Sequence, residues 1–385
     1  MQASEGGSLS TGAANSLTRG THRARVLAID ALRGFDMFWI IGADALVHAL
    51  AGLRHLRAVD AVAAQLEHVE WEGFHFYDLI FPLFVFLMGS SLVYSLGGLV
   101  ERKGRRAAMV RLARRTLLLY ALGVFYYGAM SVDDGLEQFR FLGVLQRIAL
   151  CYGLAGLAYL WLKPQGLAVL TAALLGGYWV LLSFVPVPGH GPGVFEPGRN
   201  FANYIDAVAL PGFKWNGTWD PEGLLSTLPA VASALLGVGA GLLLKWDGLN
   251  SHRKSLALAG AGAVCLALGW LWSLHFPVIK SIWTSSYVLV AGGWSALLLA
   301  LFHEVLDVRG WTAWATPFVW IGMNPITIYM LTNLVDFEDL VRRVLHRPLV
   351  DLLSPFGELL VAAASLLLAV GVCAWLYRKR IFLRV

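Results

Sequence analysis

The sequence predicts an all-α, polytopic integral membrane protein with about ten transmembrane helices and with both termini in the cytoplasm. Of its 385 residues, 57% are hydrophobic and only 14% are charged, whereas soluble domains usually carry about 25% charged residues. The mean hydropathy is +0.63. The sequence lacks the alternation typical of a membrane β-barrel, and helices satisfy their own backbone hydrogen bonds in lipid. The lipid bilayer is therefore the first expected partner, and no nucleic-acid partner is expected.

The predicted spans follow from hydropathy, because a transmembrane helix requires about 20 predominantly apolar residues. Such stretches lie near 26–50, 75–99, 112–130, 142–162, 166–186, 224–246, 254–276, 281–303, 313–334 and 357–377. The segments between them decide the orientation of the chain.

Four basic segments predict which side of the membrane is cytoplasmic. They are THRAR at 21–25, RKGRRAAMVRLARR at 102–115, the stretch from Lys245 to Lys254, and the closing RKRIFLRV. With ten spans all four fall on one side, and the positive-inside rule makes that side cytoplasmic.

The remaining segments divide the chain into a tail, a membrane domain and an external loop. Residues 1–22, rich in Gly, Ser, Thr and Ala, are expected to form a disordered cytoplasmic tail. Residues 23–385 are expected to form the transmembrane domain. No cleavable signal peptide is recognised, so the first span is expected to direct insertion. Residues 187–223 form a long external loop with many Gly, Pro and aromatic residues. This composition favours an ordered cap that covers an external mouth, rather than a passive linker.

Several classes of chemistry have no support in the sequence. The three cysteines, Cys151, Cys265 and Cys373, each lie in a separate apolar stretch. They are expected to pack in the core, without a disulfide or a metal site. No HExxH, CxxC or GxSxG motif and no phosphate-binding P-loop occurs. This argues against hydrolytic metal or serine chemistry and against an ATP-driven pump.

The first span, VLAIDALRGFDMFWIIGADALVHAL, contains four ionisable residues: Asp30, Arg33, Asp36 and Asp44. On a continuous helix they occupy about a third of the circumference. Ionisable groups inside a membrane are costly and usually mark functional sites. For Asp30 and Arg33 an ordinary ion pair between positions i and i+3 is the alternative, and Asp36 is equally open to a structural role. For Asp44 a functional role is favoured.

A second cluster of titratable residues lies in HVEWEGFHFYDLIFPLFVFLMGSS, residues 68–91. His68 precedes the second span on the external side, and Asp78 lies at the outer end of that span. Histidine changes its protonation near neutral pH and suits proton transfer or nucleophilic attack. Asp78 and Arg147 are both expected about one turn inside the membrane, where they would form either a functional or a structural ion pair.

Asn324 and one basic loop each have two interpretations. Asn324 precedes Pro325 within a predicted span and either repairs a proline kink or belongs to a site. The basic loop that includes Arg114 and Arg115 either binds phosphates or only sets the topology.

The chain resembles the heparan-α-glucosaminide N-acetyltransferase family, within the wider transmembrane acyltransferase superfamily. The resemblance rests on IDALRGFDMFWI, HVEWEGFHFYDLIFPLFVFLMGSS, GVLQRIALCY, DPEGLLSTLP, SIWTSSYVL, GMNPITIY and YRKRIFLRV, in that order through residues 26–385. It implies transfer of an acetyl group from cytoplasmic acetyl-CoA to an amino sugar or related glycan on the external side, without a metal.

The resemblance also implies roles for individual residues. His68 stands at the position of the family's key histidine, and Asp78 at that of the aspartate ten residues later. Asp44 replaces an asparagine near the outer end of the family's first span. The motifs and the resemblance together give the following candidates. They are His68, Asp44 and Asp78 for catalysis, Arg33, Arg114, Arg115 and Arg147 for coenzyme A, and Trp71, Trp219, Asp220, Glu222 and Asn324 for the acceptor or the oxyanion.

The mechanism is open between two routes. In one, His68 takes the proton of an acceptor amine while the amine attacks the thioester, and Asp44 or Asp78 orients the imidazole. In the other, His68 is acetylated first and passes the acetyl group on. Within the enzyme class, O-acetylation of a cell-surface glycan is the nearest alternative.

Two other function classes are kept in view. One is a proton-coupled transporter or a sugar or lipid flippase, and the other is a membrane scaffold without chemistry. The extra lumenal domain and first anchoring span of the animal enzyme have no counterpart in the sequence, which favours a bacterial member in the plasma (inner) membrane. A homodimer is suggested by the resemblance alone.

Overall fold

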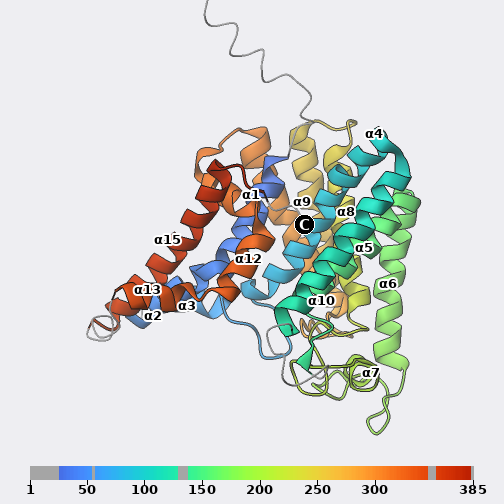
Figure 1. Cartoon of the computed structure of the whole chain (residues 1–385). Coiled ribbons are helices and arrows are strands. Elements are labelled where there is room, and N and C mark those ends of the chain that lie inside the picture. The colour runs from blue at the N-terminus through green and yellow to red at the C-terminus, as the bar shows by residue number, and fades with distance from the viewer. Residues whose placement is uncertain (1–25, 54–56, 129–137, 346–352, 383–385) are drawn as a thin grey trace, which may run out of the picture.

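The described part of this computed structural model comprises residues 26–53, 57–128, 138–345 and 353–382. The predicted tail, residues 1–22, lies outside it. Within the described residues the secondary structure consists of helices, with isolated β-bridges and no extended strand. The all-α prediction is therefore confirmed, and Figure 1 shows the helices arranged as one bundle.

The helices account for most of the described chain. In order they are α1 (Leu27–Phe38), the π-helix η1 (Trp39–Ala43), α2 (Asp44–Leu53), α3 (Arg57–Gln65), α4 (Phe76–Gly128), α5 (Val144–Trp161), α6 (Pro164–Phe184), α7 (Phe201–Ala209), α8 (Thr227–Lys245), α9 (Ser251–Trp272), α10 (Ser285–Phe302), the π-helix η3 (His303–Val308), the 3-10 helix η4 (Ala313–Ala315), α11 (Thr316–Gly322), α12 (Pro325–Leu334), α13 (Phe337–Val344) and α15 (Phe356–Arg378).

Eight of the described helical stretches are long and apolar enough to cross a membrane. One of them covers residues 76–127 and is 52 residues long, but it is interrupted at Gly104, where φ is 79° and ψ is 171°. A positive φ is favourable for glycine because it has no Cβ. In Figure 1 α4 rises in light blue, turns at the top and returns in teal. The predicted spans 75–99 and 112–130 are thus the two halves of α4.

The first predicted span is not one continuous helix. The α-helical part ends at Phe38, and the π-helical η1 follows, with Gly42 at φ 125°. Helix α2 then starts at Asp44 in a new direction, toward the lower left in Figure 1. A helical wheel drawn over the whole span therefore places Asp44 wrongly relative to Asp30, Arg33 and Asp36.

The predicted span 313–334 is also divided. Its described helices are η4, α11 and α12, and Asn324 lies in the break before α12 with φ −133° and ψ 48°. Pro325 is the first residue of α12, where its missing N–H costs nothing and its fixed φ is favourable. The carbonyl of Asn324 still accepts the N–H of Ile328 at 3.0 Å.

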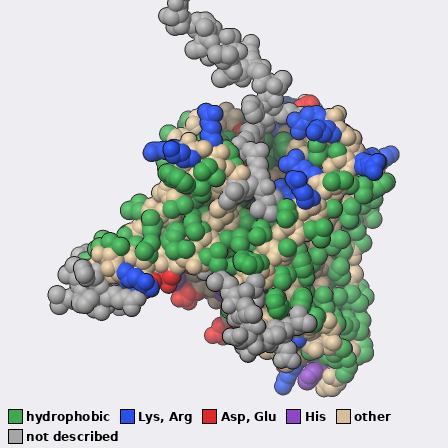
Figure 2. Space-filling model, viewed as in Figure 1, with side chains coloured by type: hydrophobic (Ala, Val, Ile, Leu, Met, Phe, Trp, Pro, Cys, Tyr) green, Lys and Arg blue, Asp and Glu red, His purple; other side chains and the backbone are tan. Residues whose placement is uncertain are grey.

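The two ends of the bundle differ in charge. The turn within α4 and the end of α15 lie at the upper end in Figure 1, and α7 lies at the lower end. In Figure 2 most Lys and Arg side chains on this face gather at the upper end, and hydrophobic side chains cover the middle. This distribution agrees with a membrane-embedded middle and a basic end.

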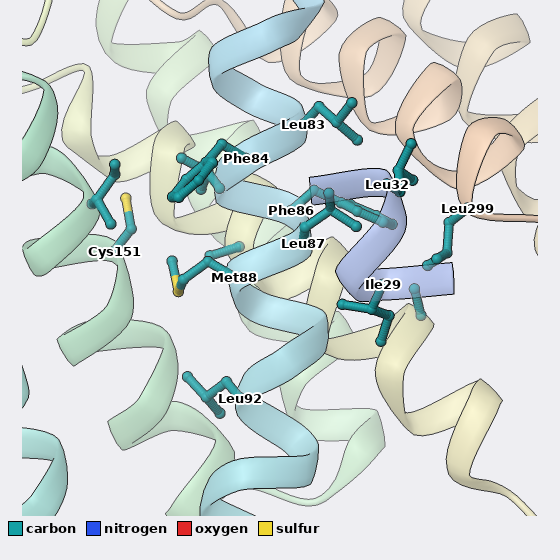
Figure 3. Packing of buried hydrophobic residues seen from close by; sticks show 14 of the residues in the cluster. Ile29, Leu32, Leu83, Phe84, Phe86, Leu87, Met88, Leu92, Cys151 and Leu299 are labelled. Atoms are coloured by element: carbon teal, nitrogen blue, oxygen red, sulfur yellow. The ribbon is translucent and has the colours of Figure 1, made fainter. Parts of the chain in front are cut away.

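The core lies where α1, α4, α5 and α10 meet (Figure 3). Buried residues from these helices include Ile29, Leu32, Leu83, Phe84, Leu87, Leu92, Cys151 and Leu299. Helix α1 approaches α11 so closely that a Cβ on Gly34 would lie 1.6 Å from the carbonyl oxygen of Phe318. Small residues permit this kind of helix contact in membranes. The cysteines are unpaired, and Cys151 and Cys373 are buried.

Residues 187–223 fold around α7 rather than forming an extended linker. Asn200 caps α7 by accepting the N–H of Asn203 at 2.9 Å. The β-bridge between Arg140 and Gly212 joins this segment to the loop before α5. We refer to residues 187–223 as the cap.

Candidate active site

The first turn of α4 positions Asp78 at the end of the bundle that carries the cap. Its side chain is fully buried, and Oδ2 accepts the backbone N–H of His75 at 3.0 Å and that of Val69 at 3.4 Å. The phenolic OH of Tyr287 donates to the Asp78 carbonyl at 2.8 Å. Asp78 therefore fixes the loop before α4 to the helix that follows it, with its other carboxylate oxygen left for side chains.

That second oxygen faces His68. Nδ1 of His68 lies 2.8 Å from Oδ1 of Asp78. Because an ionised carboxylate only accepts hydrogen bonds, Nδ1–H is the donor. The arrangement leaves Nε2 of the neutral imidazole with its lone pair. The His68 side chain is 51% exposed, in contrast to its buried partner. A buried carboxylate that orients an accessible imidazole is the arrangement expected of a general base or a nucleophile.

Lys280 is the third member of this group, and the sequence reading did not find it. Its Nζ lies 2.9 Å from Nδ1 and 3.0 Å from Nε2 of His68, and 3.4 Å from Oδ1 of Asp78. It comes from the loop between α9 and α10, 212 residues from His68 along the chain. We call His68, Asp78 and Lys280 the mouth cluster. The available signal was a single lysine directly before SIWTSSYVL.

The loops that carry His68 and Lys280 are joined by backbone hydrogen bonds. Glu72 and Ile279 form an antiparallel bridge, and the N–H of Gly73 donates to the carbonyl of Val278 at 2.9 Å. Thr284 caps α10 and accepts the N–H of Ile279 at 3.0 Å. The position of Lys280 is therefore fixed by ordered backbone on both sides.

Asp44 reaches the mouth cluster through Tyr77, another residue that the sequence reading missed. The Tyr77 hydroxyl donates to Oδ2 of Asp44 at 2.8 Å. The Tyr77 ring lies against the His68 ring, with centroids 4.8 Å apart. Asp44 thus supports the histidine indirectly, whereas Asp78 contacts it.

A cavity of about 260 Å³ opens beside His68, Tyr77, Lys280 and Glu222. Its remaining wall is mostly apolar and comes from α1, η1, α4, α5 and α12: Met37, Ile40, Ile80, Phe81, Phe84, Val144, Leu145, Ile148, Pro325, Ile326 and Tyr329. The polar residues thus stand at one part of an otherwise hydrophobic chamber, the usual composition of a small-molecule site.

The cap contributes Glu222 to that chamber and anchors it through Arg140. Nη2 of Arg140 lies 2.5 Å from Oε2 of Glu222 and 2.7 Å from Oδ1 of Asp220, and Nε lies 2.8 Å from Oδ2 of Asp220. We call Arg140, Asp220 and Glu222 the cap cluster. Asp220 is only 1% exposed and also accepts the backbone N–H of Trp215 at 3.1 Å. Its carboxylate is therefore occupied within the protein.

Burial shifts the acids of the cap toward their neutral forms. It raises the pKa of the Glu222 carboxyl, against the attraction of Arg147 and Arg140. It also raises the pKa of Asp206 to about 6, although Asp206 accepts the N–H groups of Leu224 and Asp220.

The two predicted tryptophans meet at the edge of the cap. Trp71 and Trp219 pack edge to face with ring centroids 5.8 Å apart. Nε1 of Trp71 donates to the carbonyl of Phe195 at 2.9 Å, and Trp219 is 8% exposed. They join the loop that carries His68 to the cap.

The predicted ion pair between Arg147 and Asp78 is not formed. The guanidinium is fully buried, donates to the Gly223 carbonyl at 3.2 Å and to the Ser226 hydroxyl, and lies over the Trp283 ring at 4.9 Å. Asp78 is instead engaged by His68 and Lys280. The loop before α10 places Lys280, rather than Arg147, beside the Asp78 carboxylate.

The other candidate cations lie away from the mouth cluster. Arg33 bonds with Asp30 and the Gly322 carbonyl, both at 3.4 Å, and with the Ser91 hydroxyl. Arg114 is exposed on the returning half of α4. Arg115 lies over the Tyr152 ring at 4.9 Å.

Asn324 is 1% exposed, and its amide donates to the Ile381 carbonyl at 3.0 Å. It therefore joins the break before α12 to the segment after α15. Among the described residues no group of three His, Cys, Asp or Glu side chains is arranged to hold a metal.

Known proteins with this sequence pattern point to one family. Residues 25–205 match the family model for the catalytic region of heparan-alpha-glucosaminide N-acetyltransferase. Over these residues the chain is similar to these acetyltransferases. It is 27% identical over 390 aligned residues to heparan-alpha-glucosaminide N-acetyltransferase of Mus musculus, and 29% identical over 329 to that of Homo sapiens. The resemblance that the motifs indicated is thus confirmed.

The matches extend over only part of the mouse and human proteins. The alignments cover 83% and 69% of this chain but 56% and 48% of the mouse and human proteins, so the chain spans about half the length of these curated relatives. The family match includes His68, Asp78 and Asp44, while Glu222 and Lys280 lie beyond residue 205.

Proposed function

We propose that the protein is a membrane-embedded acyltransferase that moves an acetyl group from acetyl-CoA to an amino sugar or related glycan. The observation that carries this proposal is the hydrogen-bonded pair of His68 and Asp78 at the polar part of a largely apolar cavity. The pair supplies an oriented base, and the cavity supplies a water-poor space for a thioester.

His68 acts through Nε2, because Nδ1–H is held by Asp78 at 2.8 Å. Nε2 takes the proton of the acceptor amine as the amine attacks the thioester carbonyl. Asp78 stabilises the imidazolium that forms, as the acid of a catalytic triad does. The same nitrogen is available for the alternative route through an acetyl-histidine.

The apolar wall suits the donor. A cavity of about 260 Å³ lies near the lower limit of pockets for small organic molecules. It holds the acetyl thioester and part of the pantetheine arm but not the whole cofactor. Arg33, Arg114 and Arg115 are proposed to hold the phosphates at the basic end, with the bidentate geometry that arginine offers to phosphate. Arg147 is enclosed by the Trp283 ring, Gly223 and Ser226, so we leave it out of the donor site.

Glu222 is proposed to meet the acceptor. It lines the cavity beside His68 and Lys280, and a carboxylate there accepts a hydrogen bond from the amino group of an amino sugar, which binds and reacts as the free amine. Trp71 and Trp219 form the adjacent apolar edge on which a sugar ring packs. Asp220 contributes by fixing Glu222 through Arg140.

The orientation follows from the charge distribution. We place the basic end of the bundle in the cytoplasm and the cap outside, because positive segments remain on the cytoplasmic side. Acetyl-CoA then enters from the cytoplasm and the acceptor from outside. A plasma-membrane location in a bacterium and a homodimer are kept as parts of this proposal.

The test combines donor binding with thiol release by the purified full-length protein. Calorimetry measures acetyl-CoA binding, and thiol release is followed with glucosamine or N-acetylglucosamine as acceptor. We expect micromolar binding, thiol release with glucosamine, and a loss of about 10²–10⁴-fold in His68→Ala. His75→Ala is the matched control, because His75 lies in the same loop and its Nδ1 bonds to the backbone carbonyl of Glu67, not to the mouth cluster.

Each outcome decides a separate point. Thiol release with N-acetylglucosamine, which has no free amine, would indicate O-acetylation. A stable acetyl group on His68 in the absence of acceptor would favour the covalent route. No binding at millimolar acetyl-CoA would reject acetyl transfer.

One observation favours a second candidate function, proton-coupled transport. Asp36 is fully buried in α1, and neither of its carboxylate oxygens has a hydrogen-bond partner among the described residues. Ionisable groups in that situation are typical of proton relays. The test measures solute uptake into proteoliposomes by the wild type and by Asp36→Asn. Uptake that is lost in Asp36→Asn, together with no thiol release from acetyl-CoA by the wild type, would reject acyl transfer in favour of transport.

A further inference from the structure

We propose that Lys280 is a catalytic residue whose ammonium donates a hydrogen bond to the oxyanion that forms on the thioester carbonyl. The inference rests on the proposed acetyl transfer and adds the group that stabilises its transition state. Acyl transfer requires such a donor close to the attacking nitrogen.

The position of Nζ meets this requirement. It lies 3.0 Å from Nε2 of His68, the nitrogen that Asp78 leaves available, and Lys280 lines the cavity. The C=O bond is only about 1.2 Å long, so the oxygen of a carbonyl attacked beside Nε2 lies within hydrogen-bond distance of a donor placed as Nζ is. An ammonium has three donor hydrogens, so Lys280 keeps its contact with Asp78 while it binds the oxygen.

The other donors considered for this role are committed elsewhere. The amide of Asn324 donates to the Ile381 carbonyl, and Nε1 of Trp71 donates to the Phe195 carbonyl. Nε1 of Trp283 donates to the Ser233 hydroxyl at 3.1 Å. Tyr77 donates to Asp44. Among the described residues that line the cavity, Lys280 is the one with a cationic side chain.

The step is balanced without a further reactant. The amine lone pair forms the new C–N bond, the π electrons of the carbonyl move to its oxygen, and His68 takes the proton of the amine. The oxyanion accepts a hydrogen bond from Lys280. When the carbonyl re-forms, the C–S bond breaks, and the leaving thiolate of coenzyme A takes the proton from His68. Lys280 is an ammonium throughout.

The surroundings of Lys280 make this role sensitive to pH. Burial lowers the pKa of its ammonium, and the carboxylates of Asp78 and Glu222 oppose that shift. The titratable groups that face Nζ are His68, Asp78 and Glu222. Above the lowered pKa the ammonium is lost, so the rate must fall on the alkaline side at a lower pH than for an ordinary lysine.

The experiment compares Lys280→Met and Lys280→Arg with Lys214→Met, a half-buried lysine of the cap whose Nζ contacts the Gly212 carbonyl. Thiol release from acetyl-CoA with glucosamine is measured from pH 6 to 10, together with acetyl-CoA binding. We expect Lys280→Met to lose about 10²–10³-fold in kcat with unchanged binding. Lys280→Arg should recover part of that loss and show no alkaline decline, because arginine does not deprotonate in this range.

Three results would overturn the inference. One is a wild-type kcat in Lys280→Met. Another is an alkaline decline in Lys280→Arg identical to that of the wild type. The third is a parallel loss of acetyl-CoA binding and thermal stability in Lys280→Met, which would make the lysine structural. In all three the proposed acetyl transfer stands if wild-type protein releases thiol; absence of thiol release from wild-type protein rejects both proposals.

Discussion

The mouth cluster and the cap cluster lie beside the same cavity and contain similar groups, yet they differ in how their charges are used. In the cap cluster Arg140 and Asp220 are 5% and 0% exposed at the side chain, and the guanidinium binds two carboxylates. In the mouth cluster Asp78 is equally buried, but His68 is 51% exposed and Lys280 is 22% exposed. One cluster is closed and the other is open to a ligand.

The hydrogen-bond capacity of each group shows the same contrast. The Arg140 guanidinium also lies over the Tyr127 and Trp215 rings, at 4.7 and 5.3 Å. Aromatic rings thus pack against its plane, and carboxylates accept from its N–H groups. In the mouth cluster Nε2 of His68 contacts the Lys280 ammonium, which lines the cavity, and no other polar group of the described residues. Buried charges that are fully paired hold structure, whereas an oriented, partly exposed base is equipped for chemistry.

The largest effect is expected from Asp78→Asn. The substitution removes the charge that stabilises the imidazolium and offers His68 an amide that favours the wrong tautomer. We expect thiol release to fall by about 10²–10⁴-fold, with little change in acetyl-CoA affinity. An activity within about threefold of the wild type would show that the mouth cluster is no more catalytic than the cap cluster.

Arg140→Met is expected to produce the largest loss of stability. Removal of Arg140 leaves Asp220 and Glu222 buried without their hydrogen-bonded cation, a change that costs about 3–5 kcal/mol. Thermal unfolding in detergent measures it. Arg140→Lys, which keeps the charge but loses the planar fork, should be intermediate. If Arg140→Met unfolds like the wild type while kcat collapses, the cap cluster has been assigned the wrong role.

A pH change should separate the clusters further. Burial raises the pKa of Asp206 to about 6, above its ordinary unfolded value near 4. The native protein therefore binds this proton more tightly than the unfolded chain, so this contribution to stability is present at low pH and is lost as the pH rises through about 6. Glu222 acts in the same direction.

We expect the Asp206 contribution to stability to increase by about 1–3 kcal/mol between pH 7.5 and pH 5. The difference in unfolding temperature between wild type and Asp206→Asn measures it and cancels the other titrating groups. A difference that is independent of pH would show that Asp206 is ionised in the native cap.

The smallest effect is expected from Tyr77→Phe. The change removes the hydrogen bond to Asp44 and retains the ring against His68. One such bond contributes about 0.5–1.5 kcal/mol, so kcat should fall by about 2- to 10-fold. Asp44→Asn, tested alone and with Tyr77→Phe, should cause no further loss if Asp44 acts only through Tyr77. A loss as large as that of Asp78→Asn would place Asp44 in the mouth cluster itself.

The sequence predicted well those features that depend on local composition. Hydropathy located the apolar helices, since the cost of exposing polar backbone to lipid acts on every span alike. The family resemblance led to the prediction that Asp44 or Asp78 orients His68, and Asp78, ten positions after His68 and in the first turn of α4, is the one that contacts it.

The sequence predicted poorly those features that depend on a break in a helix. The wheel through Asp30, Arg33, Asp36 and Asp44 assumed one helix, and the turn at Gly42 sends Asp44 toward Tyr77 instead. In the same way Asn324 turns to the Ile381 carbonyl at the break before α12. A local change of direction is weakly encoded in hydropathy, so the pattern did not reveal it.

The sequence by itself determined that this is a helical membrane protein, and its motifs indicated its similarity to the acetyltransferases. Only the tertiary structure decided the partners of the charges. It brought Lys280 to His68 across 212 residues and gave Asp78 that lysine in place of Arg147. The physical reason is that an ion pair is selected by distance and burial, and both are set by how remote loops pack, not by the order of residues along the chain.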